Sequence, residues 1–114
     1  MEEYNKHDAL VETIKIEDIA TDKENQDILR RLKQNDETFV TLWICNRRGG
    51  LGIICGPAYL CYGAEELGWL GYFIGKSTCL REVGFYGSSD NDTKLFIGLS
   101  KNKSIRKICF ISFL

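Results

Sequence analysis

Three stretches of the chain, 28–44, 70–85 and 95–110, repeat one pattern of apolar residues. In each stretch an apolar helical stripe precedes a polar turn and a short strand whose first, fourth and sixth residues are apolar. The apolar strand residues are Phe39, Leu42 and Ile44, then Leu80, Val83 and Phe85, then Ile105, Ile108 and Phe110. A single unit of this kind cannot bury its apolar face, so neighbouring units have to stack into one continuous core. The pattern predicts an array of helix–strand units in which function belongs to a surface rather than to a pocket.

The residues before each strand support the repeat. Leu70 and Ile74 lie ten and six residues before Leu80, and Leu95 and Leu99 keep the same two offsets before the third strand. This spacing is typical of the apolar stripe of an amphipathic helix. A helix is therefore expected before each strand.

A fourth copy of the strand pattern lies near the start of the chain, at Val11, Ile14 and Ile16. The second and third of the four expected strands are further apart than the others, which indicates an insertion at 47–63. Insertions in repeat proteins tend to gather on one face, so this glycine-rich loop is an alternative place for partner contact.

The units resemble leucine-rich repeats of the helix-containing, ribonuclease-inhibitor-like kind, from about Leu10 to Phe113. The segment 63–76, together with 99–105 after the next helix, is similar to divergent repeats found in protists. The resemblance implies an α/β fold: a short leucine-rich-repeat solenoid with a parallel β-sheet on the concave face and helices on the convex face. Residues 1–9 are then a polar leader, and 10–114 form a domain of about four units.

Charge and hydropathy limit the class of partner. Fifteen basic residues against sixteen acidic ones give a net charge of −1, which provides no electrostatic footprint for nucleic acid or an anionic membrane. The apolar runs are shorter than the roughly 18 to 20 residues that a membrane-spanning helix needs. The polar, acidic start of the chain does not resemble a signal peptide, so a cytoplasmic location is expected.

The sequence holds few groups that could carry catalysis. Its one histidine, His7, lies in the leader, and five cysteines form an odd number that favours reduced thiols over disulfides. We expect no catalytic residues, no metal site and no cofactor. The alternative is a small thiol-dependent or hydrolytic enzyme that uses Cys55.

The strand pattern also indicates which side chains are free to bind. If the strands stack as the resemblance implies, the third, fifth and seventh strand positions line the exposed concave face. The residues predicted there to contact a partner are Lys15, Glu17, Thr41, Trp43, Glu82, Tyr86 and Lys107. Trp and Tyr are enriched at interface hot spots because they bury much area with few rotatable bonds. The alternative is that Trp43 and Tyr86 only cover each other across neighbouring strands.

These observations favour a non-enzymatic protein-interaction module or scaffold that binds another protein through its concave strand face. A truncated structural fragment of a larger repeat array is a further alternative. The last strand is followed by no further helix in the sequence, and an open strand edge is a template for pairing with another chain. We therefore also expect self-association through the C-terminal strand edge.

Overall fold

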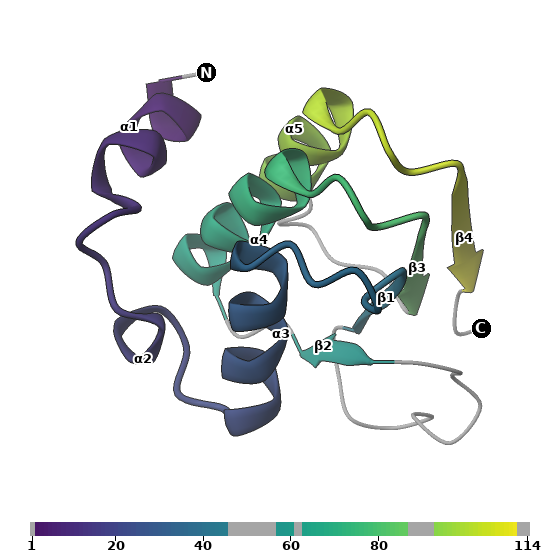
Figure 1. Cartoon of the computed structure of the whole chain (residues 1–114), viewed down its shortest axis with the longest axis horizontal. Coiled ribbons are helices and arrows are strands. Elements are labelled where there is room, and N and C mark those ends of the chain that lie inside the picture. The colour runs from purple at the N-terminus through teal and green to yellow at the C-terminus, as the bar shows by residue number, and fades with distance from the viewer. Residues whose placement is uncertain (1, 46–56, 61–62, 87–92, 112–114) are drawn as a thin grey trace.

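Helices and parallel strands alternate along most of the chain (Figure 1). The computed structural model of the chain describes residues 2–45, 57–60, 63–86 and 93–111. The helices in this part are α1 (Glu2–Leu10), α2 (Ile16–Ile19), α3 (Lys23–Lys33), α4 (Ala64–Lys76) and α5 (Thr93–Lys101). The strands are β1 (Thr41–Cys45), β2 (Ala58–Leu60), β3 (Glu82–Tyr86) and β4 (Lys107–Ile111). Three helix–strand pairs follow one another: α3 with β1, α4 with β3, and α5 with β4.

The strands form one four-stranded sheet in the order β2-β1-β3-β4, and every pairing is parallel. Equivalent residues of the three helix–strand pairs lie side by side in it. Leu42 pairs with Val83, which pairs with Ile108. Two residues further along the strands, Ile44 pairs with Phe85, which pairs with Phe110. Each such set of paired residues forms a cross-strand row. The expected α/β class with a parallel sheet is confirmed, in the register that the apolar pattern predicts.

The core lies between the sheet and the helices on one of its faces (Figure 1). Successive strand side chains point to opposite faces, so the rows that begin at Leu42 and Ile44 face the helices. The helix residues Leu32, Leu70, Ile74 and Leu95 are buried against them, and Leu99 packs at the margin. Helices α4 and α5 approach so closely at Gly98 that a Cβ added there would lie 1.9 Å from the carbonyl oxygen of Gly71.

The turns between helix and strand also repeat. Asp36, Ser77 and Asn102 each lie five residues before the first residue of a strand. Each uses its side-chain oxygen to accept a backbone N–H two or three residues further on, at 2.9 Å from Thr38, 3.1 Å from Leu80 and 2.7 Å from Ile105. Such local side-chain bonds favour a turn over continuation of the helix.

Neighbouring units are joined by a repeated backbone contact just before the strands. The N–H groups of Arg81 and Glu82 both donate to the carbonyl oxygen of Val40, at 2.8 and 3.0 Å. One unit later, the N–H groups of Arg106 and Lys107 both donate to the carbonyl oxygen of Arg81, at 2.8 and 3.2 Å. The same atoms therefore hold the second unit to the first and the third to the second.

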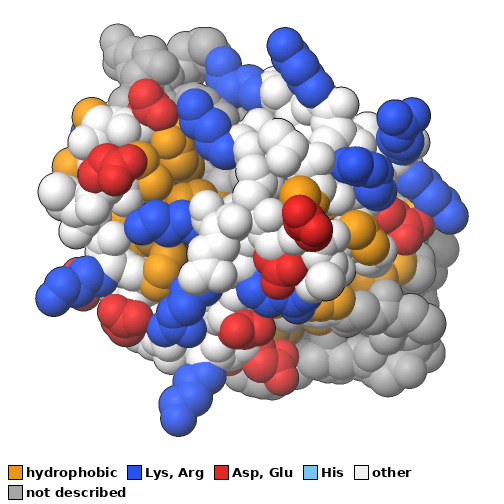
Figure 2. Space-filling view, in the orientation of Figure 1, with side chains coloured by type: hydrophobic (Ala, Val, Ile, Leu, Met, Phe, Trp, Pro, Cys, Tyr) orange, Lys and Arg blue, Asp and Glu red, His pale blue; other side chains and the backbone are white. Residues whose placement is uncertain are grey.

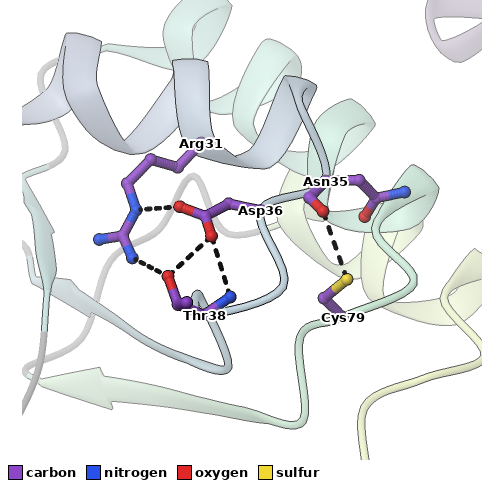
Figure 3. A network of polar contacts seen from close by, with 5 residues as sticks. All are labelled: Arg31, Asn35, Asp36, Thr38 and Cys79. Atoms are coloured by element: carbon purple, nitrogen blue, oxygen red, sulfur yellow. Dashed lines mark hydrogen bonds and ion pairs between the residues drawn. The ribbon is translucent and has the colours of Figure 1, made fainter.

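The first of these turns carries the polar network drawn in Figure 3. Asp36 accepts from the Thr38 hydroxyl at 2.7 Å and from Arg31 Nε at 3.0 Å, while Arg31 also donates to the Thr38 hydroxyl at 3.2 Å. Beside it, Asn35 adopts a positive φ of 56° and its carbonyl oxygen accepts from the Cys79 thiol of the next unit at 3.4 Å. The hydrogen bonds from Thr38, followed by the one from Arg31, lower the pKa of Asp36 to about 2.

The outer edge of β2 is closed by a side chain rather than by a strand. Asn25 of α3 is fully buried, donates from Nδ2 to the Leu60 carbonyl at 2.8 Å and accepts the Leu60 N–H on Oδ1 at 3.0 Å. Its amide thus makes the two bonds that a neighbouring peptide group would make. Glu66 of α4 completes the arrangement by accepting from Asn25 at 3.1 Å and from the Tyr59 hydroxyl at 2.5 Å.

The expected strand at Val11–Ile16 does not form, and this prediction is wrong. Helix α1 ends in a turn, where the Ile14 N–H donates to the Leu10 carbonyl at 2.9 Å, and α2 follows. The apolar spacing at 11, 14 and 16 also suits a helical turn, and Ile16 does reach the core. The place beside β1 is taken by β2, which lies inside the predicted insertion 47–63.

Two residues of the last strand were also expected in the core, and this prediction is wrong as well. Ile108 is 47% exposed and Phe110 is 67% exposed. Both residues pair with β3 in the predicted register, but no described strand lies beyond β4 to cover them. The apolar pattern fixes the face on which a side chain lies, whereas its burial depends on a neighbour.

Residues 2–9 of the expected polar leader are helical and pack against α4. His7 is buried on α4, with its ring centroid 4.2 Å from that of Trp69. Asp8 accepts from the Tyr72 hydroxyl at 2.8 Å and lies 3.4 Å from Lys76 Nζ. The leader therefore covers part of the outer surface of α4.

We predict that Asn25→Ala destabilises the fold by roughly 2 kcal/mol or more, because it leaves the Leu60 N–H and carbonyl unpaired in the interior. Urea denaturation measures the change. The control is Asp27→Ala, which alters an exposed residue of the same helix. Equal stability of the two variants would contradict the role given to Asn25.

A second prediction concerns the turn at Asp36. Its folded-state pKa of about 2 lies below the ordinary value of 3.8, so its contribution to stability is complete above pH 4 and is lost as the pH falls towards 2. Asp36→Asn should therefore be less stable than wild type at neutral pH, and the gap should narrow between pH 4 and pH 2. Denaturation curves across this range test it, with Glu37→Gln as the neighbouring exposed control. A gap that stays constant with pH would count against the network.

Candidate partner-binding face

The face of the sheet opposite the helices, here called the outer face, is organised in three cross-strand rows. The first row joins Thr41, Glu82 and Lys107. The second joins Ala58, Trp43, Gly84 and Cys109, and the third joins Leu60, Cys45, Tyr86 and Ile111. No described helix packs on this face (Figure 1).

The first row is polar and accessible. Lys107 Nζ lies 3.3 Å from Glu82 Oε2, and the Cys109 thiol contacts the same oxygen at 3.6 Å. Lys107 is exposed and Glu82 is half-buried, and ion pairs with an exposed partner add little stability. The charged groups of Glu82 and Lys107 therefore lie where a partner could contact them, at the N-terminal ends of β3 and β4.

The second row is built around Trp43. A Cβ added to Gly84 would lie 2.3 Å from the Trp43 ring, so the indole lies across the neighbouring strand in the space that glycine leaves. Trp43 stays half-exposed. The sheet therefore presents a large aromatic ring in a fixed position, supported from below by the backbone of β3.

The third row forms a small second core. Tyr86, Leu60 and Cys45 are buried, with Trp43 and Ala58 packed against them. Burial raises the pKa of the Cys45 thiol to about 11, which keeps it protonated and a poor nucleophile. Tyr86 thus packs inside this cluster and does not provide an exposed aromatic contact, which favours the structural interpretation of this ring.

The predicted site residues near the start of the chain lie elsewhere. Lys15 precedes α2, and Glu17 lies within it, on the helical side of the molecule. Glu17 accepts from Arg30 of α3 at 3.0 Å, and this hydrogen bond lowers the pKa of the Glu17 carboxyl. Because no strand forms at 11–16, neither residue joins the outer face, which corrects the expectation.

Two residues of the outer face were not predicted from the sequence. Ala58 and Leu60 belong to β2, which lies in the segment expected to be an insertion. The apolar run at 58–60, following Pro57, was the available signal for a strand. Residues 47–56 and 61–62 of the expected loop, which include Arg47, Arg48 and Cys55, lie outside the described residues.

The molecule also has hollows on its helical side. One of about 360 Å³ is lined by Ile14, Asp18, Ile19, Gly63, Glu65, Glu66 and Trp69. A second, of about 230 Å³, lies where α1, α3 and α4 meet. Neither contains a residue of the outer face. Within the described ranges, no three His, Cys, Asp or Glu side chains are grouped as metal ligands would be.

Charged and apolar side chains are mixed on the face of the molecule seen in Figure 2. Figure 2 shows basic and acidic side chains interspersed over the side viewed, with apolar groups between them. Among the helices that the structure describes, none combines the length and apolar character needed to cross a membrane.

Comparisons of the chain with family models, curated proteins and solved structures gave no match. The function therefore has to be inferred from the geometry of the outer face.

We predict that Gly84→Ala destabilises the wild-type protein by about 1–3 kcal/mol, because the new methyl group has to displace the Trp43 ring. In a Trp43→Ala background the same change should cost nothing or be slightly stabilising, since alanine is favoured over glycine within a strand. Denaturation of the four proteins of this cycle measures the coupling. Additive effects would show that the ring does not occupy the space above Gly84.

Proposed function

We propose that the chain is a short leucine-rich-repeat-like solenoid that acts as a non-enzymatic protein-interaction module. Three helix–strand pairs with a shared strand register support the solenoid. The side-chain turns at Asp36, Ser77 and Asn102 support it further. So do the paired N–H contacts to the carbonyls of Val40 and Arg81.

The observation that carries the proposal is the half-exposed Trp43 ring supported by Gly84. Interface hot spots are enriched in Trp, whose large area is buried at a low cost in conformational entropy. Here much of that cost is already met, because the ring is positioned before binding. The polar row of Thr41, Glu82 and Lys107 lies beside it and supplies hydrogen-bonding and charged groups at the rim.

A protein is a better partner for this face than nucleic acid or an anionic membrane. The net charge is −1, and the Lys107 ammonium is paired with Glu82. Nucleic-acid and membrane surfaces require a basic patch. The proposal keeps the cytoplasmic location expected from the sequence.

The enzymatic alternative draws no support from Cys45, because burial and a raised pKa keep that thiol protonated. The alternative itself concerns Cys55, which lies outside the described residues. Thiol-directed activity probes on the full chain distinguish the two functions. Labelling that depends on Cys55 and accompanies turnover would replace the binding proposal.

The test is quantitative affinity capture with wild type, Trp43→Ala, Thr41→Arg and the far-face control Asp27→Ala. A true partner should be retained by wild type and the control and lost by both outer-face variants. With the identified partner, Trp43→Ala should weaken binding by about 1 kcal/mol or more, which is roughly a fivefold rise in Kd. Thermal melts establish that each variant is folded.

Thr41→Arg separates binding from stability, because it adds bulk to the outer face while leaving Trp43 in place. Unchanged affinity in both outer-face variants would overturn the proposed face and move binding to another surface of the chain.

A further inference from the structure

The two edges of the sheet are treated differently. At β2, both backbone groups of Leu60 are occupied by the Asn25 amide. At β4, no described strand or side chain takes that place. Protected edges prevent strand pairing between molecules, and open ones permit it. Within the described residues, the sheet is therefore closed to a new strand at Leu60 of β2 and open along β4.

Apolar side chains gather at the open end. Phe96, Ile108 and Phe110, here called the β4 apolar edge, are 44%, 47% and 67% exposed. The Phe85 ring contacts two of them: its centroid lies 5.7 Å from that of Phe96 and 5.1 Å from that of Phe110. Among the described residues, the edge thus combines backbone groups that bond to no neighbouring strand with an apolar surface on the helical face.

The direction of the backbone groups follows from the bonds to β3. The Lys107 N–H donates to the Arg81 carbonyl, so Lys107 and the alternate residues Cys109 and Ile111 direct their backbone groups inwards. Ile108 and Phe110 then direct their N–H and C=O groups outwards. These two residues can bond to a strand placed beside β4.

We propose that a second copy of this chain occupies the edge, with the two β4 strands antiparallel about a two-fold axis at Cys109. Ile108 of one copy then exchanges both backbone hydrogen bonds with Phe110 of the other. The same operation sets the Ile108 and Phe110 side chains of the two copies against each other on the apolar face. A two-fold contact is self-complementary and closes at two copies.

Charge and edge closure favour this arrangement over others. The two-fold places Lys107 opposite Ile111 of the second copy, so the two lysines lie roughly 13 Å apart along the strands at about 3.3 Å per residue. Like charges therefore do not face each other. Head-to-tail addition would require a free β2 edge, which the Asn25 amide closes at Leu60.

The axis makes a sharp structural prediction. Cys109 and its copy form a non-hydrogen-bonded antiparallel pair, whose Cα atoms lie about 4.5 Å apart, within the range that a disulfide bridges. Diamide should therefore join the two thiols. Each thiol gives up one hydrogen, diamide accepts both to become its hydrazine, and one S–S bond forms between the copies.

The first measurement is sedimentation of the full chain over about 1–100 μM, the range in which exposed edges associate. Wild type should move from monomer to dimer, and Phe110→Asp should stay monomeric and folded over the whole range. Its melting temperature should fall, because it loses both the stacking on Phe85 and the stabilisation that dimerisation gives. Leu10→Asp is the matched control, because Leu10 is an exposed apolar residue on α1, away from the sheet. It should dimerise like wild type.

The second measurement is peptide mapping after diamide treatment, where the joined peptide should contain Cys109 from both copies. Cys109→Ser should abolish the link and retain the dimer. A wild-type monomer over the whole range, growth beyond two copies, or a dimer that survives Phe110→Asp would overturn the proposal. So would a link through another cysteine.

Discussion

Burial in this sheet is supplied by the neighbouring unit. Val83 and Ile108 occupy the same row, on the same face and in the same register, yet Val83 is fully buried and Ile108 is 47% exposed. The difference is that β4 lies on the outer side of β3, whereas no described strand lies beyond β4. Each helix–strand pair therefore gains its stability from contact with the next. The hydrogen bonds at the carbonyls of Val40 and Arg81 fix how that contact is made.

Much of the central sheet could be predicted from the sequence, because strand side chains alternate with a period of two. The apolar positions of 39–44, 80–85 and 105–110 fix both the face and the register of three strands. The same reasoning fails at Val11, Ile14 and Ile16, where three apolar residues suit a helix as well as a strand. β2 was missed because its edge depends on Asn25, which lies 35 residues earlier in the sequence. A contact of this range leaves no local pattern.

The outer face also contains residues whose position could be predicted from the sequence and residues whose position could not. Thr41, Glu82 and Lys107 could be assigned to one face from alternation alone, and they do form one row. The burial of Tyr86 and the position of the Trp43 ring could not, because both depend on what the adjacent strand carries at the same level. Gly84 is the clearest case: its lack of a side chain decides where a tryptophan on another strand lies.

The contact between Gly98 and the carbonyl of Gly71 also affects the curvature of the array. Hydrogen bonding holds adjacent strands about 4.8 Å apart, so the bending of a helix–strand array depends on how far apart its helices lie. Glycines at this contact bring α4 and α5 to backbone contact, which reduces the difference in spacing between the two layers. A smaller difference in spacing lowers the curvature expected over β3 and β4. If the outer face binds a protein as proposed, a shallow surface there favours the broad side of a folded protein over an inserted peptide.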